Sequence, residues 1–324
     1  MGEGVMGTSR YSCVAAAFAA FVLGAMPLAA KADTVIFQDG FEFGFQVLTP
    51  EITIAPGQQT VYCYFFHAPN ASALGIRRWT STIGAGMHHV ILYASYTGGW
   101  IPSDVEPPGT LTASPCSSSG GAGDLAGWIY AAHDHVQELV VPDDDGMGIP
   151  LAATILAGQP LFLEMYVLNT TGFPVTTSAL LKAEALAPQT PFTNTATYLT
   201  RKTNMSLGMG VVSVQDTCAT PAGAKFWWLS TRTHHFAQMS KITNALADVV
   251  VSADWEHPAA ATFAAPNFLQ FGPGGLTYEC TYDNNSGHPL HDGDNESSDE
   301  NCIGIGYFFP AAHPALCVNN LGPL

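Results

Sequence analysis

The chain of 324 residues has few charged side chains, and very few of them are basic. Lys and Arg number 10 against 26 Asp and Glu, the net charge is −16, and only 11% of residues are charged. An acidic surface of this kind repels phosphate backbones, so we expect no nucleic-acid partner. The small charged fraction also means that much of the chain must be buried or must form turns.

Beyond the N-terminus, the sequence has no apolar run long enough to cross a bilayer. The N-terminal run from Cys13 to Ala30 is apolar and Ala-rich, follows Arg10, and ends in Ala30-Lys31-Ala32. This pattern predicts a secretory signal peptide over residues 1–32, cleaved near Ala32, and not a membrane anchor. We therefore expect a secreted or periplasmic protein with no stable membrane anchor.

The sequence contains no Cys-x-x-Cys pair, so a zinc ribbon or a thioredoxin-like motif is not expected. Of its seven cysteines, Cys13 lies in the predicted signal peptide. An even number of cysteines in an exported protein predicts disulfides, and six of them allow fifteen pairings among which spacing does not choose. The six are Cys63, Cys116, Cys218, Cys280, Cys302 and Cys317.

Helical periodicity is missing too, since no 3.6-residue pattern extends over three turns outside the signal peptide. Short runs rich in Val, Ile, Tyr, Phe and Trp are instead separated by Gly, Pro, Asn and Ser. This pattern is typical of the short strands of β-sandwich or barrel domains. The clearest runs are Thr60 to His67, His88 to Tyr96, Pro160 to Asn169, Lys225 to Thr231, Ala247 to Trp255 and Cys302 to Phe309.

A segment from Ala185 to Thr197, with two prolines and several threonines, is the best candidate for a domain boundary. It divides the mature chain into residues 33–190 and 191–324. Cys63 and Cys116 are then the only cysteines of the first part, so we expect them to pair with each other. The pairing of the remaining four cysteines stays open.

Pairs of histidines give the sequence its clearest chemical signal. His88 and His89 begin an apolar strand directly after Gly84-Ala85-Gly86-Met87. Adjacent strand residues point to opposite faces, so two adjacent histidines reach one metal only at a strand end or a bulge. Imidazole suits copper, zinc and iron, and a protein without free thiolates depends on it. His88 and His89 are therefore candidate ligands, and the alternative is that they bond to each other or to water.

The other histidines carry weaker signals. The pair His234-His235 follows an apolar run and is expected deeper in a strand, where its two rings face opposite sides. The acidic loop from Asp292 to Glu300 fits no EF-hand spacing and is expected to be solvated. Four further histidines are expected to be solvated or to form hydrogen bonds, namely His133, His135, His288 and His291.

His88-His89 with the following Val-Ile-Leu-Tyr resembles the electron-transfer copper site of the copper type II, ascorbate-dependent monooxygenases. These include peptidylglycine α-hydroxylating monooxygenase and dopamine β-monooxygenase. The third histidine of that site lies in a strand similar to Leu163 to Asn169, where Tyr166 stands in its place with Met165 beside it. The resemblance implies a copper site at His88, His89 and Tyr166, with Met165 as a further candidate ligand.

Ser230 to His234 resembles the Ser-x-His-x-His segment that supplies two ligands of the family's catalytic copper. His234 keeps the second histidine, whereas Arg232 replaces the first. The methionine ligand of that copper falls at Asn301. An amide is a poor Cu(I) ligand and a guanidinium keeps its proton, so we expect this second site, Arg232, His234 and Asn301, to be degenerate.

Three C-terminal segments extend the resemblance over nearly the whole mature chain. They are Tyr278 to Asn284, Asp299 to Ile303 and Gly306 to Pro310. The resemblance implies an all-β chain of two consecutive antiparallel, jelly-roll-like β-sandwich domains with an inter-domain cleft. It also implies three disulfides, Cys63–Cys116, Cys218–Cys317 and Cys280–Cys302.

For function, the resemblance implies a secreted copper-binding oxidoreductase with a small-molecule substrate in the cleft and an ascorbate-like reductant. We expect copper at one site near His88 and His89, because the second site has lost two of its three ligands. The alternative is a non-catalytic protein that binds copper or an acidic ligand. Arg232 would then clamp a carboxylate, unless it forms a salt bridge with Asp299 or Glu300.

Overall fold

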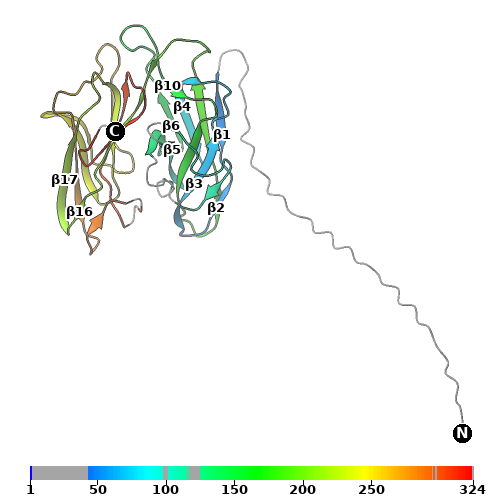
Figure 1. Ribbon diagram of the computed structural model, residues 1–324. Coiled ribbons are helices and arrows are strands. Elements are labelled where there is room, and N and C mark those ends of the chain that lie inside the picture. The colour runs from blue at the N-terminus through cyan, green and yellow to red at the C-terminus, as the bar shows by residue number, and fades with distance from the viewer. Residues whose placement is uncertain are drawn as a thin grey trace. The chain divides into compact units, whose positions relative to one another are not determined.

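Strands make up nearly all the regular structure in the part of the chain that the structure describes (Figure 1). The computed structural model describes Met1 and residues 43–97, 101–114, 116, 125–293, 295 and 298–322. The predicted signal peptide lies outside these residues. Within them, no helix is long and apolar enough to span a membrane. The prediction of an all-β protein is therefore confirmed.

The first half of the described chain contributes a six-stranded sheet in the order β1-β13-β4-β10-β14, with β9 paired to β4. Its pairings are antiparallel except for β10 with β14. The strands are β1 (Phe43–Leu48), β4 (Leu74–Ile83), β9 (Val136–Val140), β10 (Leu151–Ile155), β13 (Ala179–Ala185) and β14 (Thr193–Asn194).

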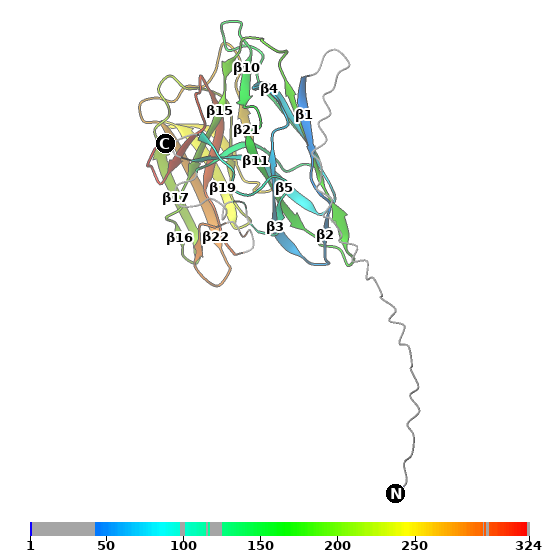
Figure 2. The same ribbon diagram turned by 45° about the vertical axis from the view of Figure 1, so that its right-hand side comes forward.

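A second six-stranded sheet has the order β6-β5-β11-β3-β7, with β8 paired to β5, and its pairings are antiparallel. Figure 2 shows β3, β5 and β11 side by side. The strands are β3 (Gln59–His67), β5 (Met87–Thr97), β6 (Ile101–Pro102), β7 (Leu111–Thr112), β8 (Leu125–Ala132) and β11 (Pro160–Leu168), and β2 (Ile52–Ile54) pairs separately with β12 (Val175–Thr177).

The second half of the described chain forms sheets of its own. A five-stranded sheet has the order β21-β18-β24-β15-β25, a four-stranded sheet the order β17-β22-β19-β20, and β16 pairs with β23. The strands are β15 (Ala196–Arg201), β16 (Ser206–Leu207), β17 (Gly210–Cys218), β18 (Lys225–Arg232), β19 (Ala237–Asn244), β20 (Ala247–Ser252), β21 (Ala260–Thr262), β22 (Leu276–Asn284), β23 (Leu290–His291), β24 (Ile303–Phe309) and β25 (Ala315–Val318).

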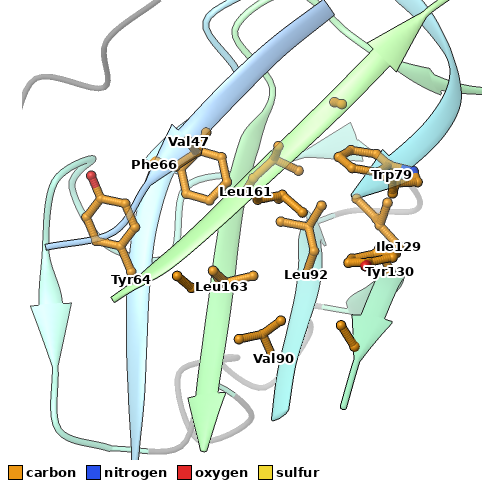
Figure 3. Packing of buried hydrophobic residues seen from close by; sticks show 14 of the residues in the cluster. Val47, Tyr64, Phe66, Trp79, Val90, Leu92, Ile129, Tyr130, Leu161 and Leu163 are labelled. Carbon is orange, nitrogen blue, oxygen red and sulfur yellow. The ribbon is translucent and has the colours of Figure 1, made fainter. Parts of the chain in front are cut away.

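Two large hydrophobic clusters hold these sheets together. The first draws buried side chains from both six-stranded sheets, and Figure 3 shows part of it, including Trp79 of β4 beside Tyr130 of β8. Their rings stack with centroids 6.0 Å apart. The second cluster draws in the same way on the five- and four-stranded sheets. Along β22 every other residue is buried, which is the period-2 pattern of a strand with one face in a core.

Three disulfides fix the described chain. They join Cys63 to Cys116, Cys218 to Cys317 and Cys280 to Cys302. These are the pairings that the resemblance implied, and Cys63–Cys116 also agrees with the expected division of the chain. Three disulfides indicate an oxidising, extracytoplasmic environment.

Strands of the two halves also contact each other. The Tyr307 hydroxyl on β24 donates to the Ile129 carbonyl on β8 at 3.0 Å. Ile91, Trp128 and Ile305 form a small buried cluster. Side chains of β5 and β8 are thus in contact with side chains of β24.

Candidate metal centre

An irregularity at the start of β5 explains how two adjacent histidines share one side. In the pairing of β5 with β11, His89 lies opposite Tyr166 and Met87 lies opposite Val167, so His88 is an extra residue. A bulge of this kind breaks the alternation of side chains along a strand. The preceding turn needs Gly86, whose φ of +76° favours glycine. The condition set by the sequence, a strand end or a bulge, is therefore met.

His88 and His89 approach each other through the same ring atom. Their Nδ1 atoms lie 3.1 Å apart, within hydrogen-bond distance, and their rings are nearly perpendicular. Two nitrogens that bind one metal, each at about 2.0–2.1 Å, come to a similar separation. The pair is thus arranged either as a hydrogen bond or as a chelate.

His133 completes the cluster from a neighbouring strand. In the pairing of β5 with β8, Val90 lies opposite Ala132, so the next residues outward, His89 and His133, become neighbours. One ring nitrogen from each of His88, His89 and His133 lies within 4.8 Å of the others. The Nδ1 atom of His133 is buried and has no hydrogen-bond partner among the described residues. The sequence predicted a solvated or hydrogen-bonding residue at His133, and the structure places its half-buried ring in the cluster.

A side chain on β9 holds the backbone of His133 in place. The Gln137 side-chain carbonyl accepts a hydrogen bond from the backbone amide of His133 at 2.8 Å. His135, two residues later, bonds instead through its Nδ1 to the Ile83 carbonyl. The two histidines of this His-x-His therefore have different partners: the ring of His133 lies in the cluster, and the ring of His135 bonds to the backbone. Their spacing in the sequence does not reveal this difference. A search for histidines that follow an apolar strand would have found His133.

Tyr166 lies beside the histidines, as the resemblance implied. Its ring stacks on His89, with centroids 5.1 Å apart and an angle of 2°, and lies 5.6 Å from His88. The Gln59 side-chain amide donates to its hydroxyl. Met165, by contrast, is fully buried in the first hydrophobic cluster opposite Val90. Adjacent strand residues face opposite sides, so Met165 does not join the histidines.

Burial and nearby positive charge keep two of these histidines neutral. His89 is 1% exposed. Burial lowers the pKa of His89 well below its ordinary value, and Arg232 and the neighbouring histidines lower it further. Burial, and then Arg232, lowers the pKa of His133 to about 3. A neutral imidazole is the form that binds a metal.

Residues from the second half of the chain cover the cluster. Arg232, the last residue of β18, places its Nη2 3.4 Å from Nε2 of His89. Trp255, from the segment between β20 and β21, stacks on His88 with centroids 5.8 Å apart. Arg232 is only 9% exposed. The histidine cluster is thus in contact with both halves of the described chain.

At the expected second site, hydrogen bonds engage both ring nitrogens of His234. Nδ1 donates to the Asp299 carbonyl at 3.0 Å, so Nε2 is the acceptor, and the Asn301 side-chain amide donates to it at 2.8 Å. Arg232 contacts His89, and its guanidinium has no lone pair to offer a metal. The three residues therefore lie near one another without presenting a set of metal-binding lone pairs.

The segment with His234 is a turn between β18 and β19, and not the interior of a strand as the sequence suggested. The Glu300 carboxylate accepts hydrogen bonds from the backbone amides of His234 and Phe236 at 2.9 and 2.8 Å. Glu300 is fully buried, so the acidic segment is not solvated throughout. At its other end, Asp292 pairs with Arg201 at 3.1 Å. His235 is exposed.

His288 and His291 are exposed and lie outside the cluster. His288 belongs to a polar turn in which Asn284 donates to its carbonyl at 2.9 Å, and Nδ1 of its ring bonds to the Pro289 carbonyl. His291 ends the short strand β23. For these two residues the expectation of solvated or hydrogen-bonding side chains agrees with the structure.

A pocket of about 200 Å³ adjoins the histidine cluster. Its lining includes His133 and Arg232, and its aromatic walls are Trp128, Trp228 and Tyr307. The indole nitrogen of Trp128 is buried without a hydrogen-bond partner among the described residues. Side chains from β8, β18 and β24 thus enclose a space with room for a small molecule.

Comparisons with known proteins identify no family for this chain. No family model matches the sequence, and no curated protein matches it. Among solved structures, the major capsid protein P2 from bacteriophage PM2 is similar at 8% identity and a TM-score of 0.33, covering 82% of this chain and 97% of its own. The naturally occurring empty particles of cowpea mosaic virus match at 10% identity and a TM-score of 0.30, over 93% and 99%. TM-scores of this size establish no common fold, so the site must be judged on its own geometry.

Proposed function

We propose that this chain is a secreted copper-binding oxidoreductase with a single metal site, in which His88, His89 and His133 hold the ion. The observation that carries the proposal is the convergence of ring nitrogens from three histidines within 4.8 Å. A buried polar atom normally has a partner, and Nδ1 of His133 has none among the described residues. A metal ion would supply that partner.

The donor set favours copper. Three neutral imidazoles bind copper, zinc, iron or nickel, and among divalent ions of the first transition row copper binds most tightly. The six cysteines of the described chain are engaged in disulfides and offer no competing thiolate. The resemblance of the His88-His89 segment to a copper site in the copper type II monooxygenases points the same way. Relative to that site, His133 would replace the missing third histidine and Tyr166 would pack against the ligands.

The scaffold of the proposal is the one that the resemblance implied. Residues 33–190 and 191–324 would form two β-sandwich domains with a cleft between them, and a small molecule would bind in that cleft. The pocket beside His133 and Arg232 would be part of this cleft. Export by a signal peptide over residues 1–32 would bring the chain to the oxidising environment that its disulfides indicate.

The second site does not fit a copper ion. The Nε2 lone pair of His234 accepts a hydrogen bond from Asn301, and Arg232 carries a fixed positive charge. Hydroxylation with two coppers, as in the resembled family, would therefore not be available to this chain. One-electron chemistry at the single site, with an ascorbate-like reductant, is the redox activity that the donors support.

Copper stoichiometry in ligand variants tests the proposal. The exported protein is loaded anaerobically with Cu(I), separated from free metal, and analysed for copper per chain. We expect one copper in the wild type and an affinity at least about tenfold weaker in His133→Gln. His135→Gln is the matched control, because His135 bonds to a backbone carbonyl outside the cluster.

Equal copper affinity in the His133→Gln and His135→Gln proteins would remove His133 from the site. Failure of the folded wild-type protein to retain any copper would end the proposal altogether. Circular dichroism of each variant establishes that the fold is intact before affinities are compared.

Two contacts favour a second candidate function, a non-catalytic protein that binds copper or an acidic ligand: Asn301 bonds to His234, and the Arg232 guanidinium bonds to His89. Oxygen uptake in the presence of ascorbate separates the two candidates. Copper-dependent uptake that disappears in His133→Gln supports an oxidoreductase. Copper binding without any uptake supports the non-catalytic protein.

A further inference from the structure

A fixed positive charge lies inside the cluster that would hold the metal. Nη2 of Arg232 is 3.4 Å from Nε2 of His89, and both side chains are almost fully buried. A guanidinium does not lose its proton in a protein. Any cation bound by the ring of His89 therefore has Arg232 on the other side of that ring.

The direction of the hydrogen bonds follows from the chemistry of arginine. A guanidinium only donates, so Nε2 of His89 is the acceptor and the proton of the neutral ring is on Nδ1. That proton can be donated to Nδ1 of His88, 3.1 Å away. Without metal, the contacts from Arg232 through His89 to His88 are therefore all satisfied.

Metal binding changes this arrangement. If the facing Nδ1 atoms of His88 and His89 bind an ion, the proton of His89 must move to Nε2. It then faces an N–H of Arg232, and two donors oppose each other. Arg232 must shift for the ion to enter, and its charge still acts on the ion through a poorly solvated region.

We infer that Arg232 makes this site selective for a singly charged ion, Cu(I), over the doubly charged ions Cu(II) and Zn(II). The inference depends on the proposed copper site and adds the oxidation state that the site prefers. The loss of hydrogen bonds is the same for every ion, whereas the Coulomb repulsion doubles with the charge of the ion. Arg232 therefore weakens the binding of every ion, and it weakens the binding of doubly charged ions more.

The charge lies close enough for a measurable effect. We expect removal of the positive charge to raise the affinity for Zn(II) at least about tenfold more than the affinity for Cu(I). A tenfold change in the ratio of Cu(II) to Cu(I) affinity corresponds to about 59 mV in a one-electron potential. Zn(II) is the better divalent probe because it undergoes no redox change during the titration.

The test compares Arg232→Gln with wild type by two competition titrations, Cu(I) against a chromophoric Cu(I) chelator without oxygen, and Zn(II) against a zinc chelator. Arg232→Lys keeps the charge and should keep a preference for Cu(I) close to that of the wild type. Lys182→Gln removes an exposed charge from β13 and should leave both affinities unchanged. Arg232→Met preserves the apolar stem and gives the same comparison if glutamine disturbs folding.

A rise in Zn(II) affinity that exceeds the rise in Cu(I) affinity by about tenfold supports the role of Arg232. Equal changes in both affinities, or none, would overturn it while leaving the copper site itself in place. If no Cu(I) binds to the wild-type protein or to any variant, the copper site fails and the selectivity fails with it.

Discussion

The surroundings of His133 depend more on its position in the fold than on the residues next to it in the sequence. It follows an apolar strand but precedes polar residues, and the nearby His135 is an ordinary hydrogen-bonding residue. His133 is half-buried, and the strand pairing places its ring beside His89. Tyr166, the residue that the resemblance proposed as third ligand, lies in the expected place with its ring stacked on His89, and its role as a ligand stays a prediction.

The pKa of His133 gives a prediction for the metal-free protein. An unfolded histidine takes up a proton near pH 6.5, whereas His133 in the folded chain does so at about pH 3, because of burial and then Arg232. The contribution of neutral His133 to the free energy of unfolding is therefore complete above about pH 6.5. It falls by about 1.4 kcal/mol per pH unit as the pH drops toward 3.

His133→Gln should remove this contribution and flatten the pH dependence. The free energy of unfolding, measured by urea titration of metal-free protein at pH 7.5 and pH 4.5, provides the check. If the wild-type protein and the variant lose the same stability between these pH values, His133 is not a buried neutral group.

At the scale of single elements, the strands were readable from the sequence and their pairing was not. The expected strand from His88 to Tyr96 is β5, Met87–Thr97, and the expected strand from Lys225 to Thr231 is β18, Lys225–Arg232. Apolar runs bounded by turn residues are a local property. The register that brings β8 next to β5 depends on contacts between distant residues, so His133 could not be placed beside His89 in advance.

The sequence requires a strand end or a bulge if His88 and His89 are to reach one metal. It does not predict which of the two forms, because local sequence does not distinguish a bulge from a regular strand end. The turn before it depends on Gly86, whose φ of +76° strains any residue with a side chain. A Cβ there would also lie 3.2 Å from the Ile54 side chain. This turn therefore positions His88 and His89.

Gly86→Ala should lower the free energy of unfolding by about 1–2 kcal/mol and should also weaken Cu(I) binding. Gly223→Ala is the matched control, since Gly223 has a φ of +74° and open space around it. Both variants should lose similar stability in urea unfolding. Copper affinity that falls equally in the two would show that the turn before β5 has no special role at the site.

On the scale of the whole molecule, the sequence predicted the all-β class and, through the resemblance, the three disulfides. Strands up to β14 and strands from β15 lie in separate sheets, while the boundary between residues 190 and 191 stays a prediction. Cysteine order and strand composition survive large changes in a site, so they carry information about scaffold. They carry no information about which metal ligands a chain has.

The two expected copper sites differ in the donors that their residues present. At the first, His133 places a third imidazole beside those of His88 and His89. At the second, Asn301 donates a hydrogen bond to His234, and the Arg232 guanidinium, which contacts His89, has no lone pair to offer. The proposed function therefore includes the binding of one copper and leaves out the reaction that needs two.

X-ray absorption at the copper edge of Cu(I)-loaded protein, combined with copper analysis, tests this account most directly. We expect one copper per chain, surrounded by nitrogen from three imidazoles and by no sulfur, and we expect the third imidazole to disappear in His133→Gln. Two coppers per chain, or a sulfur neighbour of copper, would contradict the single three-histidine site.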